Sequence, residues 1–214
     1  MDEEINLIDA KTRNEKIKSF VLENKRILTF LISAIILILL GFYSYQIYEK
    51  KQKEQLSDKY NTALIDFENG ENIKVISSLK KIIEYKNSTY SPLALYFIID
   101  NNLIENKNEI NELFNIVINE TSLEKEIKNL IIYKKALYNA DEISENELLD
   151  ILKPLTNSNS IWKSHALYLI AEYFYANDER QKSREFFEEI LIIDNANQSI
   201  ISETQKRLRR DLSE

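Results

Sequence analysis

Few side chains in this sequence could carry out catalysis. The 214 residues contain one histidine and no cysteine, which excludes a thiolate nucleophile and a thiolate metal site. His165 is followed, at steps of three to four residues, by Tyr168, Glu172 and Tyr175, a spacing that places the four side chains on one face of a helix. We predict that these four residues contact a partner and that none of them is catalytic. The alternative is that they pack on a neighbouring helix or meet water.

The composition narrows the chemistry further. Only two glycines occur, so a phosphate-binding loop or a dinucleotide fingerprint cannot be built. Five acidic residues within positions 141–150 lack the glycine and the ligand spacing of a calcium loop, and helix capping with solvation explains them. Residues 49–214 carry 22 basic and 29 acidic side chains without a basic stripe. The sequence therefore predicts no enzyme activity, no cofactor, no metal and no nucleic-acid partner.

The most distinctive segment is an uncharged run over residues 27–48. As an α-helix these 22 residues would rise about 33 Å, slightly more than the ~30 Å hydrocarbon core of a bilayer. Leucine and isoleucine dominate its centre, tyrosines gather near its C-terminal end, and Lys or Arg flank both ends. We predict a membrane-spanning anchor, marked by Ile27, Leu31, Leu40, Gly41, Tyr43, Tyr45 and Tyr48.

Other interpretations of the apolar run are weaker. A buried helix of a soluble core would have to hide apolar surface on every side, and a cleaved signal peptide would have a shorter apolar region and an Ala-x-Ala-like site. Lys and Arg are slightly more numerous before the run than after it, which favours a cytoplasmic N-terminus. The sequence thus predicts a cytoplasmic lead over residues 1–26, an anchor over 27–48 and a helical domain over 49–214.

From residue 49 onward the pattern is helical. Apolar residues recur at steps of three and four, and strand-like alternation is missing. One predicted buried stripe comprises Ile73, Ile76, Leu79, Ile82 and Ile83, and another comprises Ile127, Leu130, Ile131 and Leu137. Gly70 is suited to a left-handed helix end, and Pro154 with the polar residues 157–160 is expected to end another helix. N-terminal caps are predicted at Asn72, at Ser91 before Pro92, and in the pairs Asn106 with Glu109, Thr121 with Glu124 and Ser144 with Glu147.

The helices recur in pairs at a nearly regular spacing. The first helices of successive pairs are expected to begin near residues 57, 91, 124 and 161, and a two-helix unit of this length is typical of tetratricopeptide (TPR) arrays. A last helix over residues 199–212 would cap the array, and its basic residues 206, 207, 209 and 210 would keep it soluble or form a binding patch. We predict an all-α fold with one N-terminal transmembrane helix, a TPR-like α-solenoid of about four helix pairs and a C-terminal capping helix. In such arrays the face of His165 lines a concave groove.

The whole arrangement resembles one bacterial family. The resemblance is carried by the acidic, charged N-terminal lead, by the single anchor with Gly-Phe-Tyr-Ser-Tyr at residues 41–45, by residues 152–155 (Leu-Lys-Pro-Leu), and by Trp162, Ala166 and Ala171. It is similar to the YfgM-like family, described as an ancillary subunit of the Sec translocon with a TPR domain. The resemblance implies a single-pass inner-membrane protein with a cytoplasmic N-terminus and a periplasmic domain. It also implies contact with translocon subunits, periplasmic chaperones and client chains.

Two functions are therefore expected from the sequence. The first is a membrane-anchored interaction module that helps to hand translocated proteins to periplasmic chaperones. The second is a scaffold or regulator of envelope assembly or envelope-stress signalling that uses the same groove. An enzyme would need a site made of carboxylates and tyrosines alone.

Overall fold

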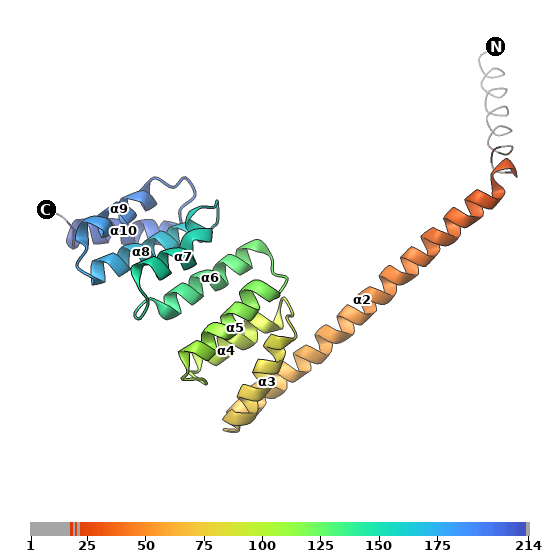
Figure 1. Ribbon diagram of the computed structural model, residues 1–214, viewed down its shortest axis with the longest axis horizontal. Helices are drawn as coiled ribbons and strands as arrows, with labels where there is room; N and C mark the ends of the chain where they lie inside the picture. The colour runs from red at the N-terminus through yellow and green to blue at the C-terminus, as the bar shows by residue number, and fades with distance from the viewer. Residues whose placement is uncertain (1–17, 19, 21, 213–214) are drawn as a thin grey trace, which may run out of the picture. The chain divides into compact units, whose positions relative to one another are not determined.

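The computed structural model describes residues 18, 20 and 22–212 (Figure 1). Across these residues the chain is helical and no strand occurs. The helices are α2 (Lys25–Glu68), α3 (Asn72–Glu84), α4 (Tyr90–Asp100), α5 (Lys107–Glu120), α6 (Lys125–Asn139), α7 (Glu145–Thr156), α8 (Lys163–Ala176), α9 (Arg180–Leu191) and α10 (Gln198–Arg210). The predicted all-α class is confirmed. The lead predicted over residues 1–26 lies mostly outside the described residues.

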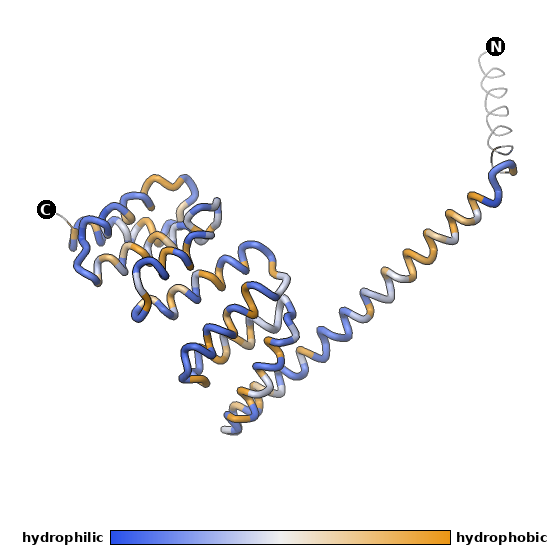
Figure 2. Tube along the Cα trace, in the orientation of Figure 1, coloured by the Kyte–Doolittle hydropathy of each residue, from blue (hydrophilic) through white to orange (hydrophobic). Residues whose placement is uncertain are grey.

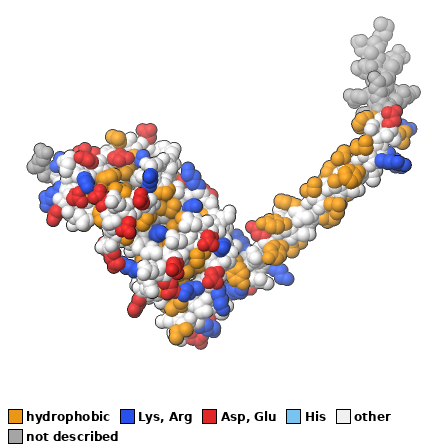
Figure 3. All heavy atoms as spheres, viewed as in Figure 1, with side chains coloured by type: hydrophobic (Ala, Val, Ile, Leu, Met, Phe, Trp, Pro, Cys, Tyr) orange, Lys and Arg blue, Asp and Glu red, His pale blue; other side chains and the backbone are white. Residues whose placement is uncertain are grey.

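Helix α2 contains the apolar run and continues beyond it without a break. It is long and apolar enough to cross a membrane, and none of its most apolar stretch is buried by the rest of the chain. Figure 2 shows this stretch in orange, followed by a hydrophilic stretch, and Figure 3 shows its hydrophobic side chains at the surface. The chain divides into two compact units, Met1–Gln55 and Leu56–Glu214, so the last part of α2 belongs to the second unit.

The helices of the second unit pack in chain order. Helix α3 packs on α4, α6 on α7, α7 on α8, α8 on α9 and α9 on α10, and α8 also contacts α6 and α10 (Figure 1). A large apolar cluster extends from Leu56 to Phe174, and a smaller one gathers around Phe187 and Ile190. Helix α8 supplies both, with Ile170 in the first cluster and Ala171 in the second. Each helix therefore reaches its full burial only between two neighbours.

Polar side chains add specific contacts between helices. The amides of Asn111 on α5 and Asn139 on α6 each donate a hydrogen bond to the other, at 2.8 and 2.9 Å. Near the start of α8, Asn129 donates to the hydroxyl of Ser160 at 3.0 Å, and that hydroxyl donates to Glu126 at 2.7 Å. Because buried polar groups must be paired, these contacts favour one alignment of the helices over others.

Three of the predicted helix signals are confirmed. Gly70 adopts φ 78°, in the left-handed region where glycine is favoured. The Asn106 side chain accepts hydrogen bonds from the backbone N–H groups of Asn108 and Glu109 at 3.0 and 3.3 Å. Ser144 forms a capping box at the start of α7. Pro154, in contrast, lies inside α7, which continues to Thr156.

The predicted caps at Asn72, Ser91 and Thr121 are wrong. Each residue is used differently: Asn72 is already inside α3, Ser91 donates its hydroxyl to the carbonyls of Ile82 and Ile83, and Thr121 donates back to Ile116. Ser91 is fully buried, so its hydroxyl satisfies carbonyl groups at the end of α3 instead of opening α4. Tertiary contacts thus decide the role of a residue that locally resembles a cap.

The predicted stripe on α3 is also corrected at one end. Ile73 is 88 % exposed, whereas Val75, which was not in the prediction, is buried with Leu79, Ile82 and Ile83. Steps of three residues fall about 60° short of a full turn, so a stripe read from Ile73 in such steps rotates away from the core. On α6 the same effect leaves Ile127 and Leu137 exposed, and Ala136 is buried instead.

Two isoleucines on α3 allow a matched test of this packing. We expect Ile82→Ala to lower the free energy of unfolding by about 2–5 kcal/mol, because it leaves a cavity in the core. The same change at the exposed Ile73 should alter it by less than about 0.5 kcal/mol. Urea unfolding of the full chain in detergent, followed by circular dichroism, measures both. Equal losses in the two variants would contradict the assigned face of α3.

Candidate functional site

The four residues predicted to contact a partner all lie on α8 and are partly buried. His165 has different neighbours from the other three residues. Its ring lies 5.0 Å from the ring of Trp162 and 5.8 Å from that of Tyr133 on α6. Nδ1 of His165 is buried and has no hydrogen-bond partner among the described residues. Burial lowers the pKa of His165, because an apolar, aromatic setting disfavours the charged imidazolium.

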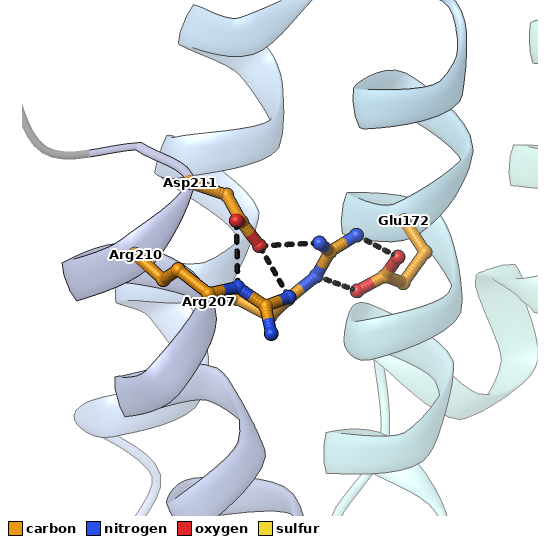
Figure 4. A network of polar contacts seen from close by, with 4 residues as sticks. All are labelled: Glu172, Arg207, Arg210 and Asp211. Carbon is orange, nitrogen blue, oxygen red and sulfur yellow. Dashed lines mark hydrogen bonds and ion pairs between the residues drawn. The ribbon is translucent and has the colours of Figure 1, made fainter.

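Tyr168, Glu172 and Tyr175 face α9 and α10. The ring of Tyr168 meets that of Phe187 edge-on at 5.3 Å, and burial, with Glu172 nearby, raises the pKa of Tyr168 to about 12. The guanidinium of Arg207 lies 4.3 Å above the ring of Tyr175 and donates to both carboxylate oxygens of Glu172, with Nε at 2.6 Å (Figure 4). Glu172 and Tyr175 therefore hold α10 against α8, whereas Tyr168 packs on α9. The predicted contact of these three side chains with a partner stays a prediction.

Arg207 is the centre of a small charged network on α10. It also pairs with Asp211, which in turn accepts hydrogen bonds from Arg210 at 2.7 and 2.8 Å (Figure 4). Hydrogen bonding from Arg210, with further contributions from Arg207, lowers the pKa of Asp211 to about 2. The side chain of Arg207 is 17 % exposed and pairs within the fold, so it does little to keep the last helix soluble, the role predicted for this position. Its bidentate ion pair with Glu172 joins α10 to α8, and arginine commonly pairs with carboxylates in this way.

A small pocket lies between α4, α5 and α6. It has a volume of about 220 Å³ and is lined by Tyr96, Ile99, Asp100, Phe114, Lys134, Leu137 and Tyr138. The ammonium of Lys134 lies 4.6 Å from the centre of the Tyr96 ring, and the buried Tyr96 hydroxyl has no partner in the described part of the chain. Burial raises the pKa of Tyr96 to about 12, so the hydroxyl stays protonated and can donate. Leu137 is 52 % exposed beside it.

A larger open groove lies between the last turns of α2 and helix α3, and we call it the α2–α3 groove. It has a volume of about 760 Å³ and is lined by Asp58, Lys59, Thr62, Asp66, Lys74, Ser78, Lys81, Glu84 and Tyr85. This groove was not predicted from the sequence. The available signal was Asp66, an acidic residue three positions after the buried Ala63 and therefore close to the apolar face of α2.

Among the described side chains, no three His, Cys, Asp or Glu groups gather in a way that could hold a metal ion. Comparisons of the chain with protein-family models, curated proteins and solved structures give no match.

The contact between α8 and α10 can be tested by one substitution. We expect Glu172→Gln to weaken it by about 1 kcal/mol, because a partly buried, charge-assisted pair is lost. Amide hydrogen exchange within α10 should then accelerate, while exchange in α3 and α4 stays unchanged. The control is Glu203→Gln, which breaks an exposed pair with Lys206 on α10 itself and should have little effect. Exchange rates that respond equally to both variants would contradict the role of Arg207.

His165 gives a prediction for the pH dependence of stability. Its folded-state pKa lies below the ordinary value of 6.5, so the unfolded chain binds the proton first as the pH falls. The stability contributed by neutral His165 is complete above pH about 6.5 and decreases below it. We expect His165→Phe to unfold at higher urea than the parent chain, with a difference that grows from pH 7.5 to pH 5. A difference that is constant over this range would contradict the burial of the imidazole.

Proposed function

We propose that the protein is a membrane-anchored interaction module, in which α2 spans a bilayer and the helices after it bind other proteins. The observation that carries this proposal is the packing of the second unit in chain order. A stack of this kind exposes a long surface built from many helices, as TPR-like arrays do when they bind extended segments or helices of partners. We interpret the helix pairs of the second unit as divergent TPR-like repeats closed by α10.

The features of α4, α6 and α8 support binding of a protein segment. The pocket beside Tyr96 combines an apolar lining with a buried hydroxyl donor, and the exposed Leu137 adjoins it. Small pockets with an apolar wall and one or two polar groups are suited to single side chains of a bound segment. His165 and Trp162 would extend the same contact along α8.

The partner we propose is the Sec translocon together with the chains and chaperones at its periplasmic exit. This part of the proposal is supported by the resemblance to the YfgM-like family. An anchor beside the translocon would raise the local concentration of the binding surface near emerging chains, so that weak contacts suffice. The N-terminus would then be cytoplasmic and the domain periplasmic.

Site-specific crosslinking tests the partner. A photo-crosslinking amino acid placed at Leu137 in the full chain should give crosslinks to translocon subunits in native membranes. The same label at Glu188, an exposed position on α9, is the control and should give few. Crosslinks at Leu137 to a different envelope complex, without translocon subunits, would replace this partner by the alternative of a scaffold or stress regulator.

The orientation is tested by a reporter fused after Glu214 that is active on only one side of the membrane. We expect activity in the periplasm, because the basic residues are slightly more numerous before the anchor. Activity in the cytoplasm would contradict a role at the exit of the translocon.

A further inference from the structure

The α2–α3 groove contains a carboxylate, that of Asp66, of which only one oxygen has a hydrogen-bond partner in the described residues. Asp66 is 7 % exposed as a residue and its side chain is 10 % exposed. Its Oδ1 accepts a hydrogen bond from Lys74 at 2.9 Å, whereas Oδ2 is buried and has no partner in the described residues. A buried carboxylate oxygen without a donor is costly, so a donor supplied from outside the fold, by water or by a ligand, would relieve that cost.

Lys74 pairs with two carboxylates and not with Asp66 alone. Its side chain is 58 % exposed and is shared with Glu71, whose Oε2 lies 3.1 Å from the ammonium. Hydrogen bonding to Asp66 and then to Glu71 raises the pKa of Lys74, so it stays charged. Because Glu71 is a second partner, the Lys74 ammonium would stay paired if another cation took its place at Asp66.

The composition of the groove indicates what the second cation is. The described residues place no three His, Cys, Asp or Glu groups together here, so nothing in the groove points to a metal ion. A side chain on a flexible apolar stem can reach a buried acceptor while its stem lies against other groups. The groove supplies such surroundings: the ring of Tyr85, which carries the ammonium of Lys59 at 4.4 Å, forms part of one wall, and the hydroxyls of Thr62 and Ser78 are further acceptors. Its volume is in the range of sites that hold several residues of a ligand.

We propose that the α2–α3 groove binds an extended segment of a partner protein and accepts a lysine or arginine side chain of that segment at Oδ2 of Asp66. The inference rests on the proposed function, because it names the chemistry of one partner. It adds a second contact surface to the pocket beside Tyr96, and it selects for a basic residue in the bound segment.

Peptide binding tests the proposal directly. The full chain in lipid nanodiscs is applied to random-sequence dodecapeptides that carry a central lysine, and to the same peptides with central N-acetyllysine. We expect a subset to bind only with free lysine, and acetylation to weaken these at least tenfold, as loss of a charge-assisted hydrogen bond predicts. An absence of lysine-dependent binders, or equal binding of the acetylated peptides, would overturn the proposal.

Three variants assign the binding to Asp66. Asp66→Asn keeps the shape and should weaken the selected peptides at least tenfold, whereas Asp58→Asn removes the same charge from an exposed lining residue and should change them less than threefold. Lys74→Met should strengthen binding severalfold, because it removes the competing cation and frees Oδ1. A purely structural role of Asp66 gives the opposite result for Lys74→Met, a loss, which would overturn the proposal even if Asp66→Asn folded poorly.

The outcome is separable from that of the proposed function. Crosslinks from Leu137 report on the face of α4 and α6, which Asp66→Asn leaves intact. If those crosslinks persist while the peptides bind without regard to lysine, the interaction module stands and only the inference about the α2–α3 groove is overturned. If the label at Leu137 gives no crosslinks to other proteins even without the Asp66→Asn change, the proposed function itself is wrong.

Discussion

The fold depends on one constraint, which is that a helix with apolar residues on two sides must be covered on both. Helix α8 shows it most clearly, because seven of its fourteen residues are buried and six of these belong to two apolar clusters. Neither α7 nor α9 alone could remove that surface from water. Packing in chain order follows, since each helix finds its neighbours among the segments closest to it in sequence. The same constraint explains why α10 is needed to cover the C-terminal side of α8.

Polar contacts refine an arrangement that apolar burial alone would leave loosely specified. The paired amides of Asn111 and Asn139 can form only when α5 and α6 are correctly aligned. Ion pairs such as Lys107 with Glu142 and Lys182 with Glu145 join elements further along the chain. The ion pairs are partly exposed and add little free energy each, so their role is mainly to fix the alignment. Asp66 differs from these groups, because one of its oxygens is buried and has no donor among the residues that the structure describes.

The sequence predicted the helices and their order well, because apolar periodicity and the turn at Gly70 are local signals. Capping was predicted correctly where the side chain bonds within its own turn, as at Ser144, and wrongly where a neighbouring helix uses the hydroxyl, as at Ser91. The face of His165 was predicted as a unit, yet α10 contacts only its C-terminal part. Asp66 was missed because the burial of a single carboxylate depends on how α2 and α3 approach each other. Such information is absent from the residues before the fold is known.

One residue of the helix stack has a practical consequence. Trp162 is the single tryptophan of the chain; it stacks on Tyr133 at 5.9 Å, and its indole N–H donates to the carbonyl of Glu126 at 3.1 Å. The tryptophan fluorescence of the protein therefore originates at the junction of α6 and α8. Emission excited selectively in indole follows the opening of that junction without any label, while events confined to the ends of the stack leave the spectrum unchanged.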